Sequence, residues 1–141
     1  MESAPIPDET AERLLLAARD AATRAYAPYS RFPVGAAALL DDGSIVQGAN
    51  IENASFGLTC CAERVACFTA AAAGIRTIVA IAVTAPRVPS VTPCGACRQV
   101  LNEFKPAETD LVVVLDGPTG PRQIPLAQLL PQAFGPRDLA E

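Results

Sequence analysis

Three cysteines and one glutamate form the pattern in this sequence that most directly suggests chemistry. They lie in two short stretches, Cys61-Ala62-Glu63-Arg64 and Pro93-Cys94-Gly95-Ala96-Cys97. Both stretches fall where helices are expected to begin, and Cys94 and Cys97 are three residues apart, so they share one side of a helical turn. If the two helices pack side by side, the three sulfur atoms converge. A helix N-terminus lowers the pKa of a thiol and favours the thiolate that binds metal.

Such a set of ligands predicts a catalytic zinc site. Three thiolates hold zinc at roughly 2.3 Å per bond and leave a fourth position for water. Zinc lowers the pKa of that water toward about 7, which yields hydroxide at neutral pH. Glu63 is placed to transfer protons, and burial near anionic sulfur is expected to raise its pKa. Because zinc with three thiolates carries a net negative charge, Arg64 first and Arg98 second are expected to donate hydrogen bonds to the sulfurs.

The same cysteines also admit other interpretations. A single Cys-X-X-Cys motif is ambiguous between metal binding, redox chemistry and neither. A structural zinc site prefers four protein ligands, for which Cys60 and Cys67 are the remaining candidates. Cys60 adjoins Cys61, however, and Cys67 lies nearly two turns further along the helix, so we expect both to be structural. A thioredoxin-like redox motif requires a different context.

Composition narrows the possible chemistry and partners. The chain has 141 residues, five cysteines, no histidine and a net charge of −4. Without histidine, Ser-His-Asp and Cys-His catalysis and imidazole ligands are excluded. The absence of a basic run disfavours a nucleic-acid partner. The N-terminus lacks the pattern of a secretory signal, and the apolar stretches are too short to span a membrane, so we expect a cytoplasmic protein with no membrane partner.

Hydrophobic spacing predicts alternating helices and strands. The apolar, β-branched residues 77–84 suit a central strand buried on both faces, Asp42-Gly43 suits a hairpin turn and Gly74 suits a helix end. A turn is expected at residues 116–118 and a loose tail from Gly135. The order indicates a central sheet covered by helices within a single domain, residues 1–141. Helices are predicted over 8–25, 61–73, 94–104 and 126–130, and strands over 34–40, 44–49, 77–84, 111–115 and 122–124.

From about residue 26 to residue 139 the chain resembles the cytidine deaminase family, in its small form with only cysteine ligands. The resemblance implies an α/β fold of three layers, α-β-α, with a five-stranded mixed sheet flanked by helices. It also implies zinc-dependent hydrolytic deamination of cytidine and deoxycytidine to uridine and deoxyuridine in pyrimidine salvage, in which zinc-bound hydroxide attacks C4 and Glu63 moves protons. The matching stretches are residues 29–36 (YSRFPVGA), 50–55 (NIENAS), 61–64 (CAER), 93–101 (PCGACRQVL) and 129–135 (LLPQAFG).

The resemblance further implies a role for particular residues. Cys61, Cys94 and Cys97 would hold one zinc ion per subunit, and Glu63 would be the catalytic residue. Phe32 would pack on the base and sugar of a nucleoside. The family is usually a homotetramer. The remaining implied residues are Asn50 and Glu52 on the ribose hydroxyls, Ala54 in the loop whose backbone reads the base, and Phe134 reaching a neighbouring subunit's pocket.

Each of these residues also has a simpler interpretation. Asn50 suits a turn, Glu52 a solvated loop, and Phe32 or Phe134 the covering of the chain's own core. No role is transferred to Phe56, because relatives often carry tyrosine there. Blasticidin-S deaminase shares the cysteine and glutamate motifs, but the stretch 50–53 and the aromatic residue at 32 look more like the nucleoside enzymes.

Overall fold

The computed structural model describes residues 5–140. The predicted single domain also includes residues 1–4 and 141, which lie outside the described residues. The predicted order of helices and strands is confirmed, with two added short 3-10 helices. The elements are α1 (Asp8–Ala22), β1 (Gly35–Leu40), β2 (Ile45–Ala49), η1 (Phe56–Leu58), α2 (Ala62–Ala72), β3 (Ile78–Thr84), α3 (Gly95–Glu103), β4 (Val112–Gly117), β5 (Gly120–Pro125), α4 (Leu126–Leu129) and η2 (Pro136–Asp138).

The five strands form one mixed sheet in the order β2-β1-β3-β4-β5. Strand β1 is antiparallel to both β2 and β3, β3 is parallel to β4, and β4 is antiparallel to β5. The predicted central position of β3 is confirmed. Two parallel neighbours require a crossover connection, and here that connection carries α3.

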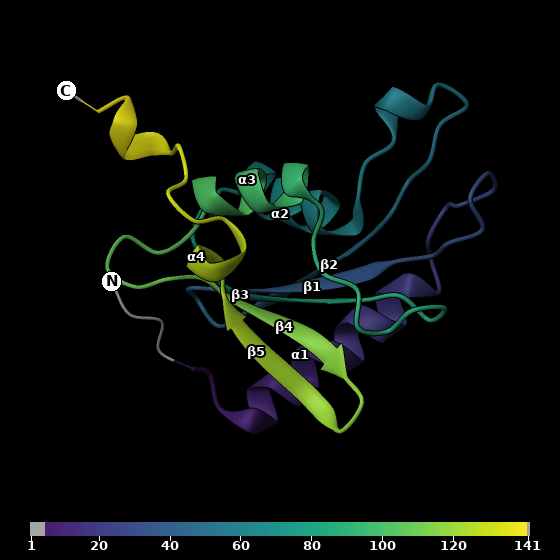
Figure 1. Cartoon of the computed structure of the whole chain (residues 1–141), viewed down its shortest axis with the longest axis horizontal. Coiled ribbons are helices and arrows are strands. Elements are labelled where there is room, and N and C mark those ends of the chain that lie inside the picture. Colours follow the sequence, from purple (N-terminus) through teal and green to yellow (C-terminus); the bar gives the residue numbers. More distant parts are fainter. Residues whose placement is uncertain (1–4, 141) are drawn as a thin grey trace.

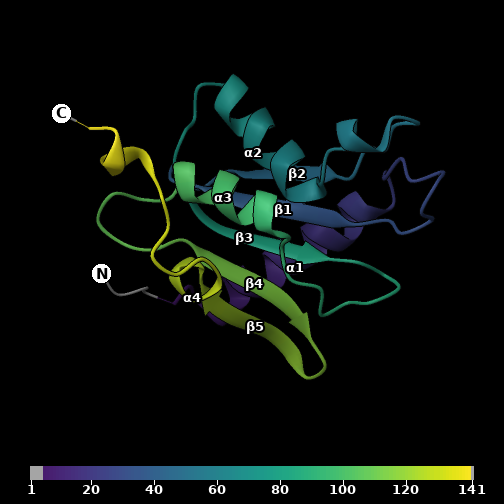
Figure 2. The same cartoon turned by 45° about the horizontal axis from the view of Figure 1, so that its top comes forward.

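Helices cover both faces of this sheet. Helix α1 packs on one face, against Ala37, Ala80 and Val114, whereas α2 and α3 lie together on the other face (Figures 1 and 2). Alternate strand residues supply the two cores, since Ala36 and Ala38 belong to the α2/α3 side. The three-layer α-β-α fold inferred from the resemblance is therefore confirmed.

Four predicted features need correction: the end of α1, the turn after β4, the length of β5 and the loose tail. Helix α1 ends at Ala22 rather than at residue 25. Immediately after this end, the Thr23 hydroxyl donates a hydrogen bond of 2.6 Å to the carbonyl of Asp20. Strand β4 continues through residues 116–117, so the turn falls at residues 118–119 and β5 is longer than predicted. Asp116 stays in the strand because Arg19 of α1 pairs with its carboxylate at 2.8 Å. The tail is ordered by a turn, because the Gly135 amide donates to the Asp138 carboxylate at 2.7 Å.

A close contact at Gly48 sets α2 directly on the sheet. A methyl group at this position in β2 would meet the Ala62 carbonyl and would lie 2.6 Å from the Ala66 amide. Both atoms belong to backbone in the first turns of α2, which cannot move away as a flexible side chain would. The first turn of α2 also carries Glu63 and follows Cys61, so Gly48 fixes the height of these residues above the sheet.

We predict that Gly48→Ala destabilises the protein by roughly 1–3 kcal/mol, because overpacking forces the helix away from β2. Urea-induced unfolding of the zinc-loaded protein measures this change. Gly57→Ala is the matched control, since a methyl group at Gly57 meets open space within the described residues. Equal unfolding midpoints for the two variants would show that Gly48 does not set the helix position.

Candidate active site

Two helix N-termini bring three sulfur atoms together on one side of the sheet. Cys61 immediately precedes α2, Cys94 immediately precedes α3, and Cys97 lies in the first turn of α3. The Sγ atoms of Cys61 and Cys94 are 3.9 Å apart, those of Cys94 and Cys97 are 3.5 Å apart, and all three lie within 4.8 Å of one another. We call this group the cysteine triad. None of its members forms a disulfide.

The spacing of the cysteine triad fits zinc. A tetrahedron with zinc–sulfur bonds of about 2.3 Å has edges of roughly 3.8 Å, which is close to the sulfur separations found here. Within the described residues these three cysteines are the group that could hold a metal, and Glu63 does not join them. Three protein ligands are typical of catalytic rather than structural zinc sites. Cys60 and Cys67 stay outside the group, as expected.

Arg64 supplies positive charge beside the sulfurs. Its Nη2 atom donates to Cys61 Sγ at 3.3 Å, as the sequence predicts. Hydrogen bonding to Cys97 and to Arg64 lowers the pKa of Cys61 to about 5 despite partial burial. The Nε atom of Arg64 is buried and lacks a partner within the described residues. The bond from Nη2 favours the thiolate form of Cys61, which is the form that binds metal.

Glu63 is a buried carboxyl group next to this negative charge. Only 4% of the surface of this residue is exposed to solvent. Burial raises its pKa to about 7, and the charge of Cys61 acts in the same direction. A carboxyl group with this pKa exchanges protons readily near neutral pH, which suits a general acid and base.

Glu63 and two members of the cysteine triad, Cys61 and Cys94, line a cavity of about 380 Å³, which we call the triad cavity. Of the residues predicted to contact substrate, Phe32, Asn50 and Glu52 line it, whereas Ala54 does not. The structure thus joins three of the four predicted substrate residues to the chemical groups. The lining residues are Ser30, Phe32, Val34, Asn50, Glu52, Thr59, Cys61, Ala62, Glu63, Val83, Val91, Thr92 and Cys94.

Asn50 is only 7% exposed, and its amide fixes the loop across the cavity. Its Oδ1 accepts a hydrogen bond from the Val34 amide at 2.8 Å, and its Nδ2 donates to the Phe32 carbonyl at 3.0 Å. An amide side chain has two donor hydrogens and two acceptor lone pairs, so one of each stays available. Asn50 is therefore more than a turn residue, and it retains capacity for a hydroxyl group.

Glu52 fixes the same loop from its other side. Its carboxylate accepts hydrogen bonds from the Tyr29 amide at 3.0 Å, the Ser30 amide at 3.1 Å and the Ser30 hydroxyl. The Ser30 hydroxyl lowers the pKa of Glu52, so this group is an ionised acceptor at neutral pH. A carboxylate has about four lone-pair sites, which leaves capacity for one hydroxyl donor.

The predicted hydrogen bond from Arg98 to a sulfur is not formed. Its guanidinium donates to the Pro93 carbonyl at 2.7 Å, the Leu129 carbonyl at 2.9 Å and the Thr92 hydroxyl at 3.2 Å. Arg98 lies in the first turn of α3, from which its side chain reaches back along the preceding loop and across to α4. The residue therefore holds the backbone that leads into Cys94 instead of neutralising sulfur charge.

Phe134 lies on the surface, away from the triad cavity. The residue is 60% exposed, and its carbonyl accepts hydrogen bonds from Gln99 at 2.8 Å and Asn102 at 3.2 Å. It does not cover this chain's own core, which was the simpler interpretation. Contact with a neighbouring subunit stays a prediction.

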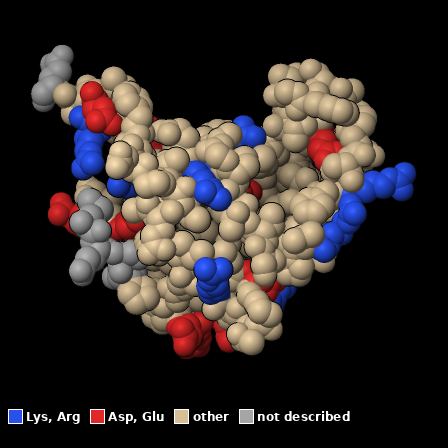
Figure 3. Space-filling model, viewed as in Figure 1, with Lys and Arg blue, Asp and Glu red and all other residues tan. Residues whose placement is uncertain are grey.

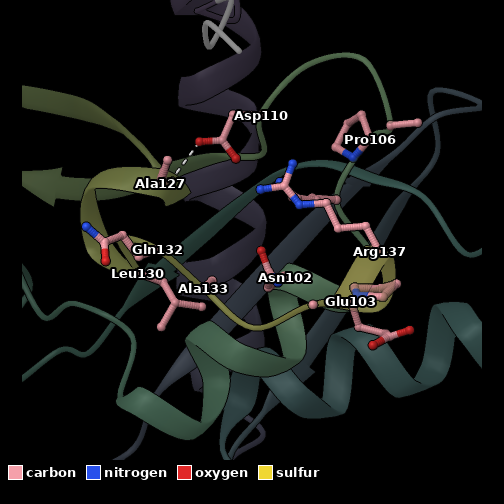
Figure 4. Close-up of a pocket in the computed structure, with 13 residues that line it drawn as sticks. Asn102, Glu103, Pro106, Asp110, Ala127, Leu130, Gln132, Ala133 and Arg137 are labelled. Carbon is pink, nitrogen blue, oxygen red and sulfur yellow. Dashed lines mark hydrogen bonds between the residues drawn. The ribbon is translucent and has the colours of Figure 1, made fainter. Parts of the chain in front are cut away.

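A second cavity, of about 630 Å³, lies between the end of α3, α4 and the C-terminal segment (Figure 4). Asn102, Asp110 and Arg137 are among the polar residues that line it. Its lining includes neither the cysteine triad nor Glu63, and Asp110 is already bonded to the Ala127 amide at 2.8 Å. This cavity is therefore separate from the chemical groups described above.

Sequence reasoning missed two residues beside the triad cavity. Ser30 accepts a hydrogen bond from the Phe32 amide at 3.0 Å, a local serine turn that the two-residue spacing could have suggested. Arg87 places its guanidinium 5.6 Å from the centre of the Phe32 ring. That contact joins two distant loops, and no local pattern in the sequence signals it.

The chain belongs to the cytidine and deoxycytidylate deaminase family. The model of that family's zinc-binding region matches residues 8–114, which include the cysteine triad and Glu63. The fold and the arrangement of the cysteine triad define the same class, a zinc-binding deaminase.

Relatives with assigned names agree with this membership. The chain is 52% identical over 129 residues to a cytidine deaminase of Halalkalibacterium halodurans, covering 91% of this chain and 96% of the relative. The crystal structure of cytidine deaminase from Burkholderia pseudomallei has a TM-score of 0.78 and 47% identity, covering 86% of this chain and 97% of that one. The crystal structure of cytidine deaminase from Mycobacterium tuberculosis has a TM-score of 0.77 and 44% identity, covering 93% of this chain and 100% of that one.

We predict that the purified protein holds one zinc ion per chain and that Cys61→Ala, Cys94→Ala and Cys97→Ala each lose it. Removing one of three thiolates leaves too few strong ligands to retain the ion. Metal analysis after gel filtration measures the ratio. Cys60→Ala and Cys67→Ala are controls that should keep full zinc, although Cys67→Ala should reduce stability because this thiol is buried. Zinc loss from Cys60→Ala comparable to that from Cys94→Ala would contradict the assigned ligand set.

Proposed function

We propose that this protein hydrolyses the C4 amino group of cytidine and deoxycytidine, giving uridine or deoxyuridine and ammonia. The observation that carries the proposal is that a buried Glu63 lines one cavity of about 380 Å³ together with Cys61 and Cys94 of the cysteine triad. Family membership and the cytidine deaminases named above support the choice of substrate. We also propose that one domain carries the whole activity.

In this proposal Glu63 transfers the protons of the reaction. When bound, zinc supplies the Lewis acidity that activates a water molecule as the nucleophile. Glu63 takes one proton from the water as the new carbon–oxygen bond forms at C4 and delivers it to the ring nitrogen. It then takes the second proton from the new C4 hydroxyl group and delivers it to the departing amine. Its pKa of about 7 leaves both protonation states accessible. When the carbon–nitrogen bond breaks, both of its electrons stay on the nitrogen, and the amine leaves as ammonia.

Three residues of the triad cavity bind the nucleoside in this proposal. Phe32 supplies an aromatic face for the base and sugar, since stacking on aromatic side chains is a common way to hold a base. The ionised Glu52 accepts from a ribose hydroxyl, and the free donor of Asn50 bonds a second one. Ala54, which does not line the triad cavity, reads the base through the backbone of its loop in this proposal.

A free nucleoside suits this site better than a polynucleotide. On the face in Figure 3, most Lys and Arg side chains stand apart from one another, and those that adjoin at the right-hand edge form a short group and not a stripe across the face. Phosphate contacts by such a stripe would supply most of the affinity for nucleic acid.

Within residues 5–140, none of the helices combines the length and apolar character of a membrane span. We propose a cytoplasmic enzyme of pyrimidine salvage.

Glu63→Gln is expected to keep the zinc ion and to lower kcat for cytidine by about 100- to 10,000-fold, because the amide keeps the shape of the side chain but cannot exchange protons. The loss of cytidine absorbance and the release of ammonia measure the rate. Glu12→Gln, at an exposed position of α1, is the matched control. A zinc-loaded Glu63→Gln protein with wild-type kcat would remove this residue from the mechanism.

We further propose that the active form is a homotetramer. Two segments stand away from the sheet, namely the loop with η1 and the C-terminal segment (Figure 1). Both carry large exposed apolar side chains: Phe56 is 73% exposed and Phe134 is 60% exposed. Burial against another copy would remove this apolar surface from water. The number of subunits and the reach of Phe134 into a neighbour's pocket come from the family resemblance.

Light scattering after gel filtration should give four chain masses for the wild-type protein. Phe134→Ala should retain zinc and reduce kcat/KM for cytidine by roughly tenfold, as expected when an aromatic interface contact is lost. Leu16→Ala, on the exposed face of α1, serves as control for removal of a surface apolar group. A fully active monomer would contradict both the assembly and the role of Phe134.

A further inference from the structure

The main chain of Phe32 is fixed from within the fold, but its ring requires separate support. Its amide donates to Ser30 Oγ at 3.0 Å, and its carbonyl accepts from Asn50 Nδ2 at 3.0 Å. These two bonds hold the backbone of the 23–34 loop, which joins α1 to β1. They leave the side-chain torsions of a half-buried aromatic residue undetermined.

Arg87 provides that support from a different loop. The Cζ atom of Arg87 lies 5.6 Å from the centre of the Phe32 ring, within the range of a cation–π contact. The Nη1 atom of the same guanidinium donates to the Arg31 carbonyl at 3.1 Å. Arg31 has a φ of 55°, a left-handed conformation that a residue with a side chain adopts reluctantly. One guanidinium therefore holds both the ring and the unusual backbone turn that precedes it.

The 85–94 loop that carries Arg87 is itself anchored on the sheet. The Ser90 hydroxyl donates to the Asp116 carbonyl at 2.9 Å, and the Thr84 hydroxyl donates to the Asp116 carboxylate at 2.9 Å. Arg19 pairs with the same carboxylate at 2.8 Å. The loop begins after Thr84, is held near its middle by Ser90 and ends at Cys94 before α3, so Arg87 lies in a segment that is anchored on β4.

We infer that Arg87 is a positioning residue for substrate recognition: it holds the Phe32 ring in the orientation that receives the base and sugar. Arg87 does not line the triad cavity, so it acts through Phe32 and not on the reacting atoms. The inference rests on the proposed deamination of a nucleoside. It also explains why an exposed arginine has its guanidinium directed at an aromatic ring and a carbonyl instead of at solvent.

The test compares Arg87→Leu and Arg87→Lys with the wild-type enzyme. Leucine keeps apolar bulk but removes the cation and the hydrogen bond, so KM for cytidine should rise roughly two- to tenfold while kcat and zinc content stay near wild type. Lysine keeps the cation but lacks the planar fork, so KM should be intermediate. Arg76→Leu, which removes an exposed arginine between α2 and β3, is the charge-matched control and should leave KM unchanged.

A second measurement separates binding from turnover. Calorimetric titration of cytidine into zinc-loaded Glu63→Gln should give a weaker Kd, by the same factor, when Arg87→Leu is added. An unchanged KM and Kd in Arg87→Leu overturns the inference, as does a loss of kcat that follows loss of zinc. A defect seen with cytidine 5′-monophosphate but not with cytidine also overturns it, because Arg87 would then act on a phosphate.

The proposed function and this inference can fail separately. If the wild-type enzyme is inactive on cytidine, both are wrong. If the wild-type enzyme is active and Arg87→Leu has the same KM and Kd as the wild type, only the inference is wrong.

Discussion

The convergence of two helix N-termini on one side of the sheet is the constraint on which the site depends. Cys61 and Cys94 both stand immediately before a helix, where exposed backbone amides and the helix dipole favour a negatively charged sulfur. The two helices share a face of the sheet, and Gly48 lets α2 lie directly on β2. Backbone packing therefore decides whether the Sγ atoms of Cys61 and Cys94, which are 33 residues apart in the chain, stand 3.9 Å apart.

Rigid helices hold the chemical groups, and loops hold the surfaces that would contact a substrate. This division has a physical consequence, because a loop has to be fixed before it can select a ligand. Asn50 uses one donor and one acceptor on the backbone of the 23–34 loop, and Glu52 accepts two backbone amides and one hydroxyl of the same loop. What capacity they keep is therefore presented from fixed positions, which reduces the entropy lost when a ligand binds. Their structural and proposed binding roles support each other.

The sequence predicted the order of elements, the central strand and the hairpin at residues 42–43, because each depends on local patterns. It predicted the gathering of the cysteines on the condition that the two helices pack side by side, which the structure confirms. Strand β3 is apolar on both faces, and Gly43 and Gly74 adopt positive φ as their turns require. The extent of β4 was not predictable, since Asp116 looks like a turn residue until Arg19 pairs with it. The bonds of Arg98 to main-chain carbonyls are likewise tertiary, and no spacing in the sequence distinguishes a carbonyl partner from a sulfur.

A sequence without histidine makes the charge around the metal the central problem of the site, because every thiolate ligand adds a negative charge that a neutral imidazole would not add. The four residues 61–64, at the start of α2, supply both a cation for this negative charge and a group that can carry protons. Arg64 is three residues after Cys61, so it lies on the same side of the helix and reaches the sulfur at 3.3 Å. Glu63 is two residues after Cys61 and lies on another side, where burial favours its neutral form. The cation thus faces the sulfurs and the proton carrier faces the cavity, and exchanging their positions would place like charges together.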